Sequence, residues 1–188
     1  MKITKTELDG VYIVEPKVFK DARGYFYESW NQKAFEEVGL HYTWVQDNQS
    51  KSVYGTVRGI HYQKGGDAQA KLVRALQGRV LDVAVDLRKG SPTYGKHVAV
   101  ELSEDNHRQL LIPRGFGHGF SVLSDSAVFA YKCDNGYAPE SEGSVRFNDE
   151  DLSIDWRIDN DRALLSDKDT NAQSFAEYSQ DPDFTYGR

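Results

Sequence analysis

A histidine, a lysine and an arginine occur close together in the sequence, and these residue types can together move a proton beside a bound anion. The segment Thr56–Gln63 (TVRGIHYQ) places Arg58 and His61 around a glycine, and Lys71 follows a Gly-Gly loop. An imidazole exchanges protons near neutral pH, while a fixed ammonium stabilises charge that develops on an oxygen. A lone histidine is more often structural than catalytic, so it is the combination of the three groups that indicates an enzyme.

A second cluster of charged and aromatic residues lies near the N-terminus, in Asp21–Trp30 (DARGYFYESW). Arg23 and Glu28 flank a predicted turn there. A guanidinium can bind a phosphate through two parallel hydrogen bonds, and aromatic rings can stack on a nucleobase. A hairpin with a surface ion pair explains the same residues, so the segment alone leaves both interpretations open.

Uncharged polar residues at alternate positions predict a ligand pocket. In Val45–Ser52 (VQDNQSKS), Gln46, Asn48 and Ser50 are two positions apart, which puts them on one face of a strand. A barrel interior that holds three such side chains is usually a binding pocket.

Acidic residues and tyrosines that could assist proton transfer follow in three segments. In Leu81–Arg88 (LDVAVDLR), alternation should turn one acid inward, where Asp82 could orient Lys71 or the histidine. Tyr131–Gly143 and Leu164–Asp169 add tyrosines and carboxylates. A tyrosine near a cation can deliver a proton, and a carboxylate can hold an imidazole in its basic tautomer. Taken singly, these are ordinary strand and loop residues.

The spacing Pro-x-Gly-x-x-His in Pro113–Phe120 (PRGFGHGF) resembles the second motif of cupins, whose histidine, here His118, is ordinarily a metal ligand. Metal-binding cupins carry His-x-His in their first motif and an acidic residue soon after it. This chain has His61, Tyr62 and Gln63 instead. Capture of a transition metal would need other ligands, so we predict no metal and no cofactor.

Most of the chain consists of short segments in which apolar and polar residues alternate and which end at Gly, Pro, Asn or Asp, a pattern typical of strands and turns. It predicts strands at Gly10–Pro16, Tyr25–Trp30, Thr43–Ser50, Val57–Gln63, Lys71–Gln77, Gly78–Asp86, Lys96–Leu102, Gln109–Ile112, Gly119–Ser124, Ala127–Cys133 and Val145–Phe147. These are too many for one flat sheet, and closure into a barrel or jelly roll removes exposed edges. We therefore predict an all-β protein.

Only one helix has a clear start and stop in the sequence. Asn31 is the expected N-cap, Gln32–Val38 the helix with Phe35 and Val38 on one face, and Gly39 the C-terminal stop. We expect one or two short peripheral helices in a single domain.

Composition and charge are those of an ordinary globular chain of 188 residues. The net charge is -6 without a Lys/Arg-rich run, which argues against extended nucleic-acid binding. Cys133 is the single cysteine, the N-terminus lacks the apolar stretch of a signal peptide, and no run approaches the roughly 18 apolar residues that cross a membrane. We expect a cytoplasmic protein. Its polar end, residues 171–188, is either an ordered arm or a loose tail.

The chain resembles the dTDP-4-dehydrorhamnose 3,5-epimerase family in a series of motifs that occur in order from roughly residue 3 to residue 170. They are D-x-R-G-x-F-x-E, Q-D-N-x-S, R-G-x-H-Y-Q, Lys71, D-V-A-V-D-x-R, P-x-G-F-x-H-G-F, Y-K and L-S-x-K-D. The resemblance implies a cupin-type jelly roll, a homodimer with strands exchanged between subunits, no cofactor, and a part in making dTDP-L-rhamnose.

The same resemblance implies roles for individual residues. His61 is the expected base, Asp169 its partner, Lys71 the stabiliser of an enolate and Tyr131 the acid. The residues expected to bind the substrate, a dTDP-4-keto-6-deoxyhexose, are Arg23, Glu28, Gln46, Asp47, Asn48, Arg58, Lys71, His118, Glu142 and Lys168. This chemistry explains the residue types. Removing a proton from C3 or C5, beside the C4 ketone, gives an enolate that needs a cation, and inversion needs an acid on the face opposite the base.

Other interpretations stay open at this point. A related enzyme that inverts only C3 or only C5 would carry the same motifs. A sugar-nucleotide-binding cupin without activity should lack His61, Lys71 or Tyr131, and all three are present. Gln63 argues against a metal-dependent cupin oxygenase.

The first-motif sequence predicts turnover without added metal, because Gln63 stands where a metal-binding cupin has its second histidine. Dialysis against a chelator should leave the rate of epimerisation unchanged, measured before and after treatment. A loss of activity that one divalent metal specifically restores would overturn the metal-free assignment.

Overall fold

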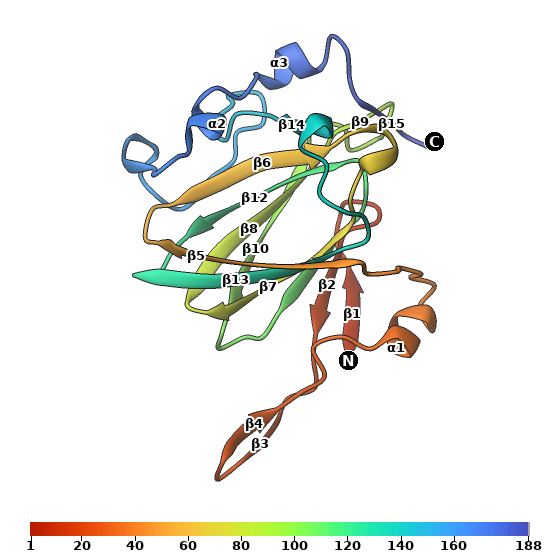
Figure 1. Cartoon of the computed structure of the whole chain (residues 1–188), viewed down its shortest axis with the longest axis vertical. Coiled ribbons are helices and arrows are strands. Elements are labelled where there is room, and N and C mark those ends of the chain that lie inside the picture. The colour runs from red at the N-terminus through yellow and green to blue at the C-terminus, as the bar shows by residue number, and fades with distance from the viewer. Residues whose placement is uncertain (188) are drawn as a thin grey trace.

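The computed structural model describes residues 1–187, whose strands form two facing antiparallel sheets (Figure 1). The six-stranded sheet contains, in spatial order, β1 (Lys2–Lys5), β2 (Tyr12–Glu15), β11 (Gln109–Ile112), β7 (Lys71–Gln77), β13 (Ser126–Cys133) and β5 (Gln46–Val53). The five-stranded sheet contains β10 (His97–Ser103), β8 (Arg79–Asp86), β12 (Phe116–Val122), β6 (Val57–Gln63) and β14 (Glu142–Ser144). The expected all-β jelly roll is confirmed.

The remaining elements are short. A hairpin of β3 (Phe19–Asp21) and β4 (Gly24–Phe26) extends away from both sheets (Figure 1), and β9 (Arg88–Lys89) pairs in parallel with β15 (Phe184–Thr185). The α-helices are α1 (Gln32–Glu36), α2 (Asp167–Thr170) and α3 (Phe175–Tyr178), and single 3-10 turns occur at Gly65–Asp67, Pro139–Ser141 and Asn160–Arg162. None of the described helices is long and apolar enough to cross a membrane.

Alternation along the strands separates interior from outer side chains. On β8, Val80 and Ala84 join the core between the sheets, whereas Leu81, Val83 and Val85 pack on the outer face of the five-stranded sheet. Both faces of β8 are buried because the chain after β14 covers that outer face. The sequence of β8 is therefore a nearly continuous apolar run interrupted by acidic residues.

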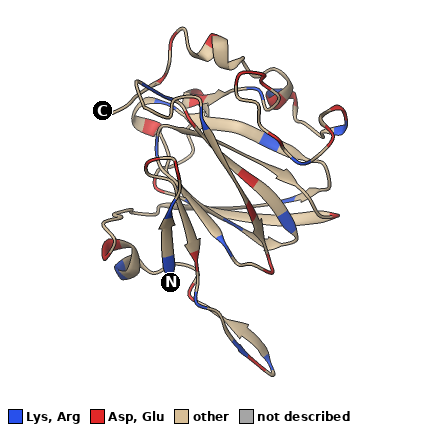
Figure 2. Cartoon of the chain, turned by 180° about the vertical axis from the view of Figure 1, so that it is seen from behind, with Lys and Arg blue, Asp and Glu red and all other residues tan. Residues whose placement is uncertain are grey.

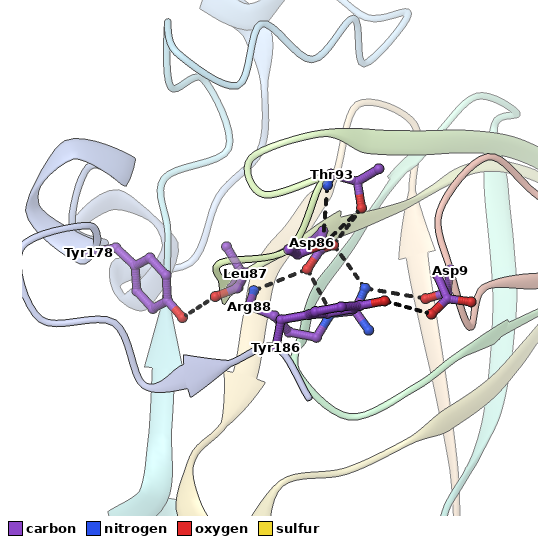
Figure 3. Close-up of polar contacts among 8 residues, drawn as sticks. Asp9, Asp86, Leu87, Arg88, Thr93, Tyr178 and Tyr186 are labelled. Carbon is purple, nitrogen blue, oxygen red and sulfur yellow. Dashed lines mark hydrogen bonds and ion pairs between the residues drawn. The ribbon is translucent and has the colours of Figure 1, made fainter. Parts of the chain in front are cut away.

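Residues 171–187, which we call the C-terminal arm, pack against the rest of the chain. The Tyr178 hydroxyl donates to the carbonyl of Leu87 at 2.7 Å, and Tyr186 lies over the guanidinium of Arg88 at 5.0 Å (Figure 3). With β15 paired to β9, the arm is attached to the five-stranded sheet along its length.

The strands expected at Val57–Gln63, Lys71–Gln77 and Gln109–Ile112 are confirmed with the same bounds. Two other expectations were partly wrong. β4 ends at Phe26, well before Trp30, and Val145–Phe147 is not a strand, although Val145 shares two backbone hydrogen bonds with Ile60 and forms a bridge to Gln173. Val145 and Phe147 alternate with a polar residue because both pack on the outer face of the sheet.

The predicted helix begins where expected but is two residues shorter. The Asn31 side chain caps it by accepting from the backbone of Ala34 at 3.1 Å. Phe35 is buried, whereas Val38 is exposed, so the expected shared face of these two residues was wrong. The chain leaves the helix after Glu36, and Leu40 packs in the same cluster as Phe35 in place of Val38.

Candidate functional site

Side chains from both sheets line an interior cavity of about 140 Å³. They are Ser50, Arg58, His61, Lys71, His118, Phe120 and Tyr131. β5, β7 and β13 supply one wall, and β6 and β12 supply the other. The structure thus brings together both imidazoles, the lysine, the tyrosine and one arginine that the sequence singled out.

Arg58 and His61 are three positions apart on β6 yet share the interior face, because a bulge shifts the register of the strand. On neighbouring β12, His118 pairs with His61 and Phe120 pairs with Arg58. Two positions along β12 therefore correspond to three positions along β6. Gly59 lies in the bulge with φ of 128°, and a Cβ there would overlap the backbone of β12. Only glycine fits this position.

His61 is paired with a buried carboxylate. Its Nε2 lies 2.5 Å from Oδ1 of Asp169, whose other oxygen accepts from the Ser166 hydroxyl at 2.6 Å. Burial alone would raise the pKa of Asp169, but the hydrogen bonds from His61 and Ser166 outweigh it and hold the pKa at about 2. The ionised carboxylate accepts the Nε2 proton, which leaves Nδ1 as the basic nitrogen of the imidazole.

His118 forms a second imidazole–carboxylate pair. Its Nε2 lies 2.8 Å from Oδ1 of Asp82, which is fully buried. Asp82 faces inward as alternation predicted, but the histidine that it holds is His118 and not His61. Burial lowers the pKa of His118, against the opposing charge of Asp82, so this imidazole is neutral at pH 7. Oδ2 of Asp82 has no hydrogen-bond partner among the described residues.

Lys71 and Tyr131 face His61 from the opposite sheet, with the Lys71 Nζ 5.9 Å from the centre of the Tyr131 ring. Burial lowers the pKa of Lys71, while the acidic groups of Cys133 and Asp82 act against that change. Burial also raises the pKa of Tyr131, which keeps the phenol protonated. A poorly hydrated ammonium stabilises an oxyanion more strongly than one in water, and the phenol is available as an acid.

Polar side chains extend the site from the cavity. Gln46 and Asn48 lie on the same strand face as Ser50 and bond to each other at 3.0 Å. On β14, Glu142 forms an ion pair with Lys168 at 2.5 Å, and the charges of both act on Lys71. The binding of substrate by these four residues stays a prediction.

Three other expected binding residues lie away from the cavity. Arg23 is at the tip of the β3–β4 hairpin, bonded to Asp21 at 2.6 Å, with a side chain that is 90% exposed. Glu28 is an exposed residue just after the hairpin. Asp47 is on the face of β5 opposite to Asn48 and pairs with Lys132 at 3.0 Å.

Sequence reasoning missed two serines that hold site residues. Ser52 on β5 accepts from Nε of Arg58 at 3.1 Å and thereby orients the guanidinium. Ser166 caps α2 in a reciprocal arrangement in which its hydroxyl and the Asp169 carboxylate each accept from the other's backbone. The Ser-x-x-Asp spacing is a capping-box signal that was present in the sequence.

Gln63 binds two loops through its side-chain amide. Its amide nitrogen donates to the carbonyls of Asp67 and Gly136 at 2.7 and 3.0 Å, and its oxygen accepts from the backbone of Ala138. Within residues 1–187, no cluster of three His, Cys, Asp or Glu side chains could hold a metal ion.

The fold and the site define the chain as a cupin-type jelly roll whose interior carries imidazole, phenol, lysine and arginine side chains. The family model described as dTDP-4-dehydrorhamnose 3,5-epimerase matches residues 5–177. The chain belongs to this family of isomerases, and the resemblance seen in its motifs is confirmed.

Individual relatives agree. The dTDP-4-dehydrorhamnose 3,5-epimerase of Shigella flexneri is 54% identical over 178 residues, 94% of this chain and 97% of the relative. The crystal structure of the Elizabethkingia anophelis enzyme of that name is 61% identical, with a TM-score of 0.90 over 94% of this chain and 97% of the other. A Legionella pneumophila dTDP-6-deoxy-D-glucose-3,5-epimerase in complex with dTDP-4-keto-L-rhamnose is 47% identical, with a TM-score of 0.94 over 100% and 99% of the two chains.

The low pKa of Asp169 predicts a pH-dependent contribution to stability. Because the pKa is lowered from 3.8 to about 2, the stabilisation is complete above pH 3.8 and is lost as the pH falls through 2. It amounts to about 2 kcal/mol at neutral pH, of which about 1 kcal/mol is lost by pH 3. Urea unfolding at pH 5.5 and pH 3 should show a smaller decrease for Asp169→Asn than for the wild type. The exposed-site variant Asp125→Asn is the control, and an equal decrease in all three proteins would contradict this assignment.

Proposed function

We propose that this chain epimerises C3 and C5 of dTDP-4-keto-6-deoxy-D-glucose to give dTDP-4-keto-L-rhamnose through enolate intermediates, in the biosynthesis of dTDP-L-rhamnose. The observation that carries the proposal is one cavity lined by a carboxylate-paired imidazole, a buried ammonium and a phenol. Epimerisation beside a ketone requires these three groups and no redox partner.

His61 acts as the base. With Asp169 accepting the Nε2 proton, Nδ1 of His61 removes the proton from C3 or C5. The Asp169 carboxylate then stabilises the imidazolium that forms. The enolate oxygen at C4 is stabilised by Lys71, a type of electrostatic contribution worth roughly 3 kcal/mol per donor.

Tyr131 acts as the acid on the other face of the sugar ring. His61 projects from the five-stranded sheet and Tyr131 from the six-stranded sheet, so a ring held between them has the base on one side and the acid on the other. Proton removal and return from opposite sides invert the carbon. The positions of the two residues on opposing sheets support this assignment.

The substrate-binding residues surround these groups. Arg58, held by Ser52, and the neutral His118, held by Asp82, are oriented donors in the cavity. Gln46, Asn48, Glu142 and Lys168 bind more distant parts of the sugar nucleotide. Asp47 lies on the opposite face of β5, where it pairs with Lys132, so its contact with the substrate would lie outside this cavity.

The enzyme is a homodimer in which each subunit inserts its β3–β4 hairpin into the site of the other. Every residue of both hairpin strands is exposed, including Phe19 and Phe26, and the hairpin points away from its own sheets (Figure 1). Exposed aromatics on an extended element favour a protein contact. Arg23 and Glu28 thereby reach a diphosphate or nucleotide bound by the partner subunit.

The proposal extends to cofactors, partners, compartment and domain organisation. The enzyme uses no metal or cofactor, consistent with the loop-binding role of Gln63. Acidic and basic residues are interspersed along the strands and loops (Figure 2), which fits a protein that binds neither nucleic acid nor membrane. The buried free thiol of Cys133 fits a reducing compartment such as the cytoplasm. Residues 1–188 make up one domain, because the C-terminal arm packs on the five-stranded sheet.

Proton NMR of dTDP-4-keto-6-deoxyglucose incubated with the protein in deuterium oxide tests the activity. We expect deuterium uptake at both C3 and C5 together with the L-rhamno product. Uptake and inversion at only one carbon would identify a single-site epimerase, and uptake at neither would refute the proposal.

The Tyr131→Phe variant separates the acid from the base. It removes only the phenolic proton, so His61 should still form the enolate and return a proton to the original face. Deuterium wash-in to the substrate should persist while inverted product falls roughly 100-fold or more. His61→Ala is the matched comparison, in which wash-in and product should both disappear. Equal losses of wash-in and product in Tyr131→Phe would mean that Tyr131 is not a dedicated acid.

Mixed dimers test the exchange of hairpins. When Arg23→Ala and His61→Ala subunits are mixed, each heterodimer should regain one working site, which restores up to about a quarter of wild-type activity in a twofold-symmetric dimer. Mixing His61→Ala with Lys71→Ala is the control, because both residues lie in the same subunit's cavity and no site is restored. The absence of rescue in the first mixture would place Arg23 in its own subunit's site or in another role.

A further inference from the structure

Adjacent residues of β6 face opposite sides of the five-stranded sheet. His61 lines the cavity, and Tyr62 lies on the outer face with 5% of its surface exposed. There the Tyr62 hydroxyl donates to Oδ2 of Asp183 at 2.9 Å and accepts from Nε2 of Gln173 at 3.2 Å. Both partners belong to the C-terminal arm, so the strand that carries the base is bonded directly to the arm.

Aromatic packing reinforces this attachment. The Tyr62 ring meets Tyr178 edge-on at 5.7 Å and Phe184 edge-on at 5.4 Å. On its other side, a Cβ at Gly143 would overlap the Tyr62 ring, so β14 also packs directly against it. The hydroxyl therefore has a fixed position, and its hydrogen bonds do not depend on side-chain motion.

The far end of the arm is anchored on buried charge. The fully buried Asp86 carboxylate accepts from the Arg88 guanidinium at 2.8 Å and from Thr93 at 2.7 Å (Figure 3). Arg88 in turn lies under Tyr186, whose hydroxyl donates to Asp9 at 3.3 Å. Of these anchor residues, Tyr186 lies beyond residue 177, where the match to the family model ends.

Asp169 depends on the segments that flank it. It is part of α2, a helix of four residues, and so short a helix has no stability of its own. The chain is tied to the body just before α2 by a bridge between Thr56 and Leu164, and just after it by a bridge between Val145 and Gln173. Gln173 is also the residue that donates to Tyr62.

We propose that Tyr62 is a positioning residue that links β6 to the C-terminal arm and so sets the distance between His61 and Asp169. The link runs from Tyr62 through Gln173 to α2 on one side, and through the peptide bond to His61 on the other. The inference rests on the proposed role of His61 as the base. A displacement of a base by a fraction of an ångström is enough to lower the rate severalfold.

The test compares variants by steady-state kinetics. Tyr62→Phe keeps the ring and removes the two hydroxyl hydrogen bonds, and we expect kcat to fall about fivefold while KM changes less than twofold. Asp183→Ala removes one of these two bonds and should lower kcat less, and the double variant should be no slower than Tyr62→Phe, which already lacks that bond. Asp183→Asn keeps an acceptor for the hydroxyl and should retain most of the activity.

Tyr94→Phe is the matched control. The Tyr94 hydroxyl also bonds to the arm, at Ser179 over 2.9 Å, but Tyr94 is not on β6. This variant should keep the wild-type kcat. An unchanged kcat in both Tyr62→Phe and Asp183→Ala, or an equal loss in Tyr94→Phe, would overturn the positioning role and leave only general stabilisation by the arm.

A spectroscopic measurement separates this inference from the proposed function. The imidazole proton shared by His61 and Asp169 should give a downfield proton NMR signal, assigned by its disappearance in Asp169→Asn. The signal should shift or broaden in Tyr62→Phe and stay in place in Tyr94→Phe. If the wild type lacks epimerase activity but the signal responds in this way, the proposed function fails and the positioning role stands. A signal that does not change in Tyr62→Phe refutes the positioning role.

Discussion

The hydrogen bond between His61 and Asp169 is the contact on which the path of the chain depends. It joins residues 108 positions apart, one on a strand of the jelly roll and the other on a four-residue helix outside it. Because a buried carboxylate is costly unless it is well bonded, the chain must also bring Ser166 and the Gly59 backbone to the same place. The route to that point crosses the outer face of the five-stranded sheet, where Trp156 is fully buried and donates to a backbone carbonyl at 2.7 Å. Apolar burial on that face offsets the desolvation of the charged groups inside.

The polar site lies within the apolar core because residues two positions apart on a strand share its inward face, and one of them lines the site while the other belongs to the core. On β12, His118 is followed two positions later by Phe120, and on β13, Tyr131 follows Phe129 in the same way. The Phe120 and Phe129 rings stack across the interior at 4.3 Å, and the His118 ring stacks on Phe129 at 6.1 Å. These aromatic walls exclude water, which strengthens the field of Lys71 and explains the shifts of its pKa and that of His118.

Period-two alternation was sufficient to predict most strands and the inward placement of Asn48 and Asp82, because these depend only on local geometry. Alternation predicts opposite faces for Arg58 and His61, which are three positions apart, and only the bulge at Gly59 places them together. The pairing of His61 with Asp169 came from the family resemblance alone, because no local pattern specifies a contact over such a sequence separation. β9 and β15 were missed because strands of two residues carry no period, and Val38 was misplaced because the helix ended two residues early.

Two facing sheets suit a reaction that needs different groups on the two sides of one ring. A side chain on a sheet points along the normal of that sheet, so residues on opposing sheets approach a ligand between them from opposite directions. In the mechanism that we propose, a proton removed by His61 on one side of the ring is returned by Tyr131 on the other. What the architecture does not supply by itself is the alignment of the base, since its carboxylate partner comes from outside the sheets. In the positioning role that we propose, the C-terminal arm supplies that alignment through Tyr62 on the outer face, one residue along β6 from His61.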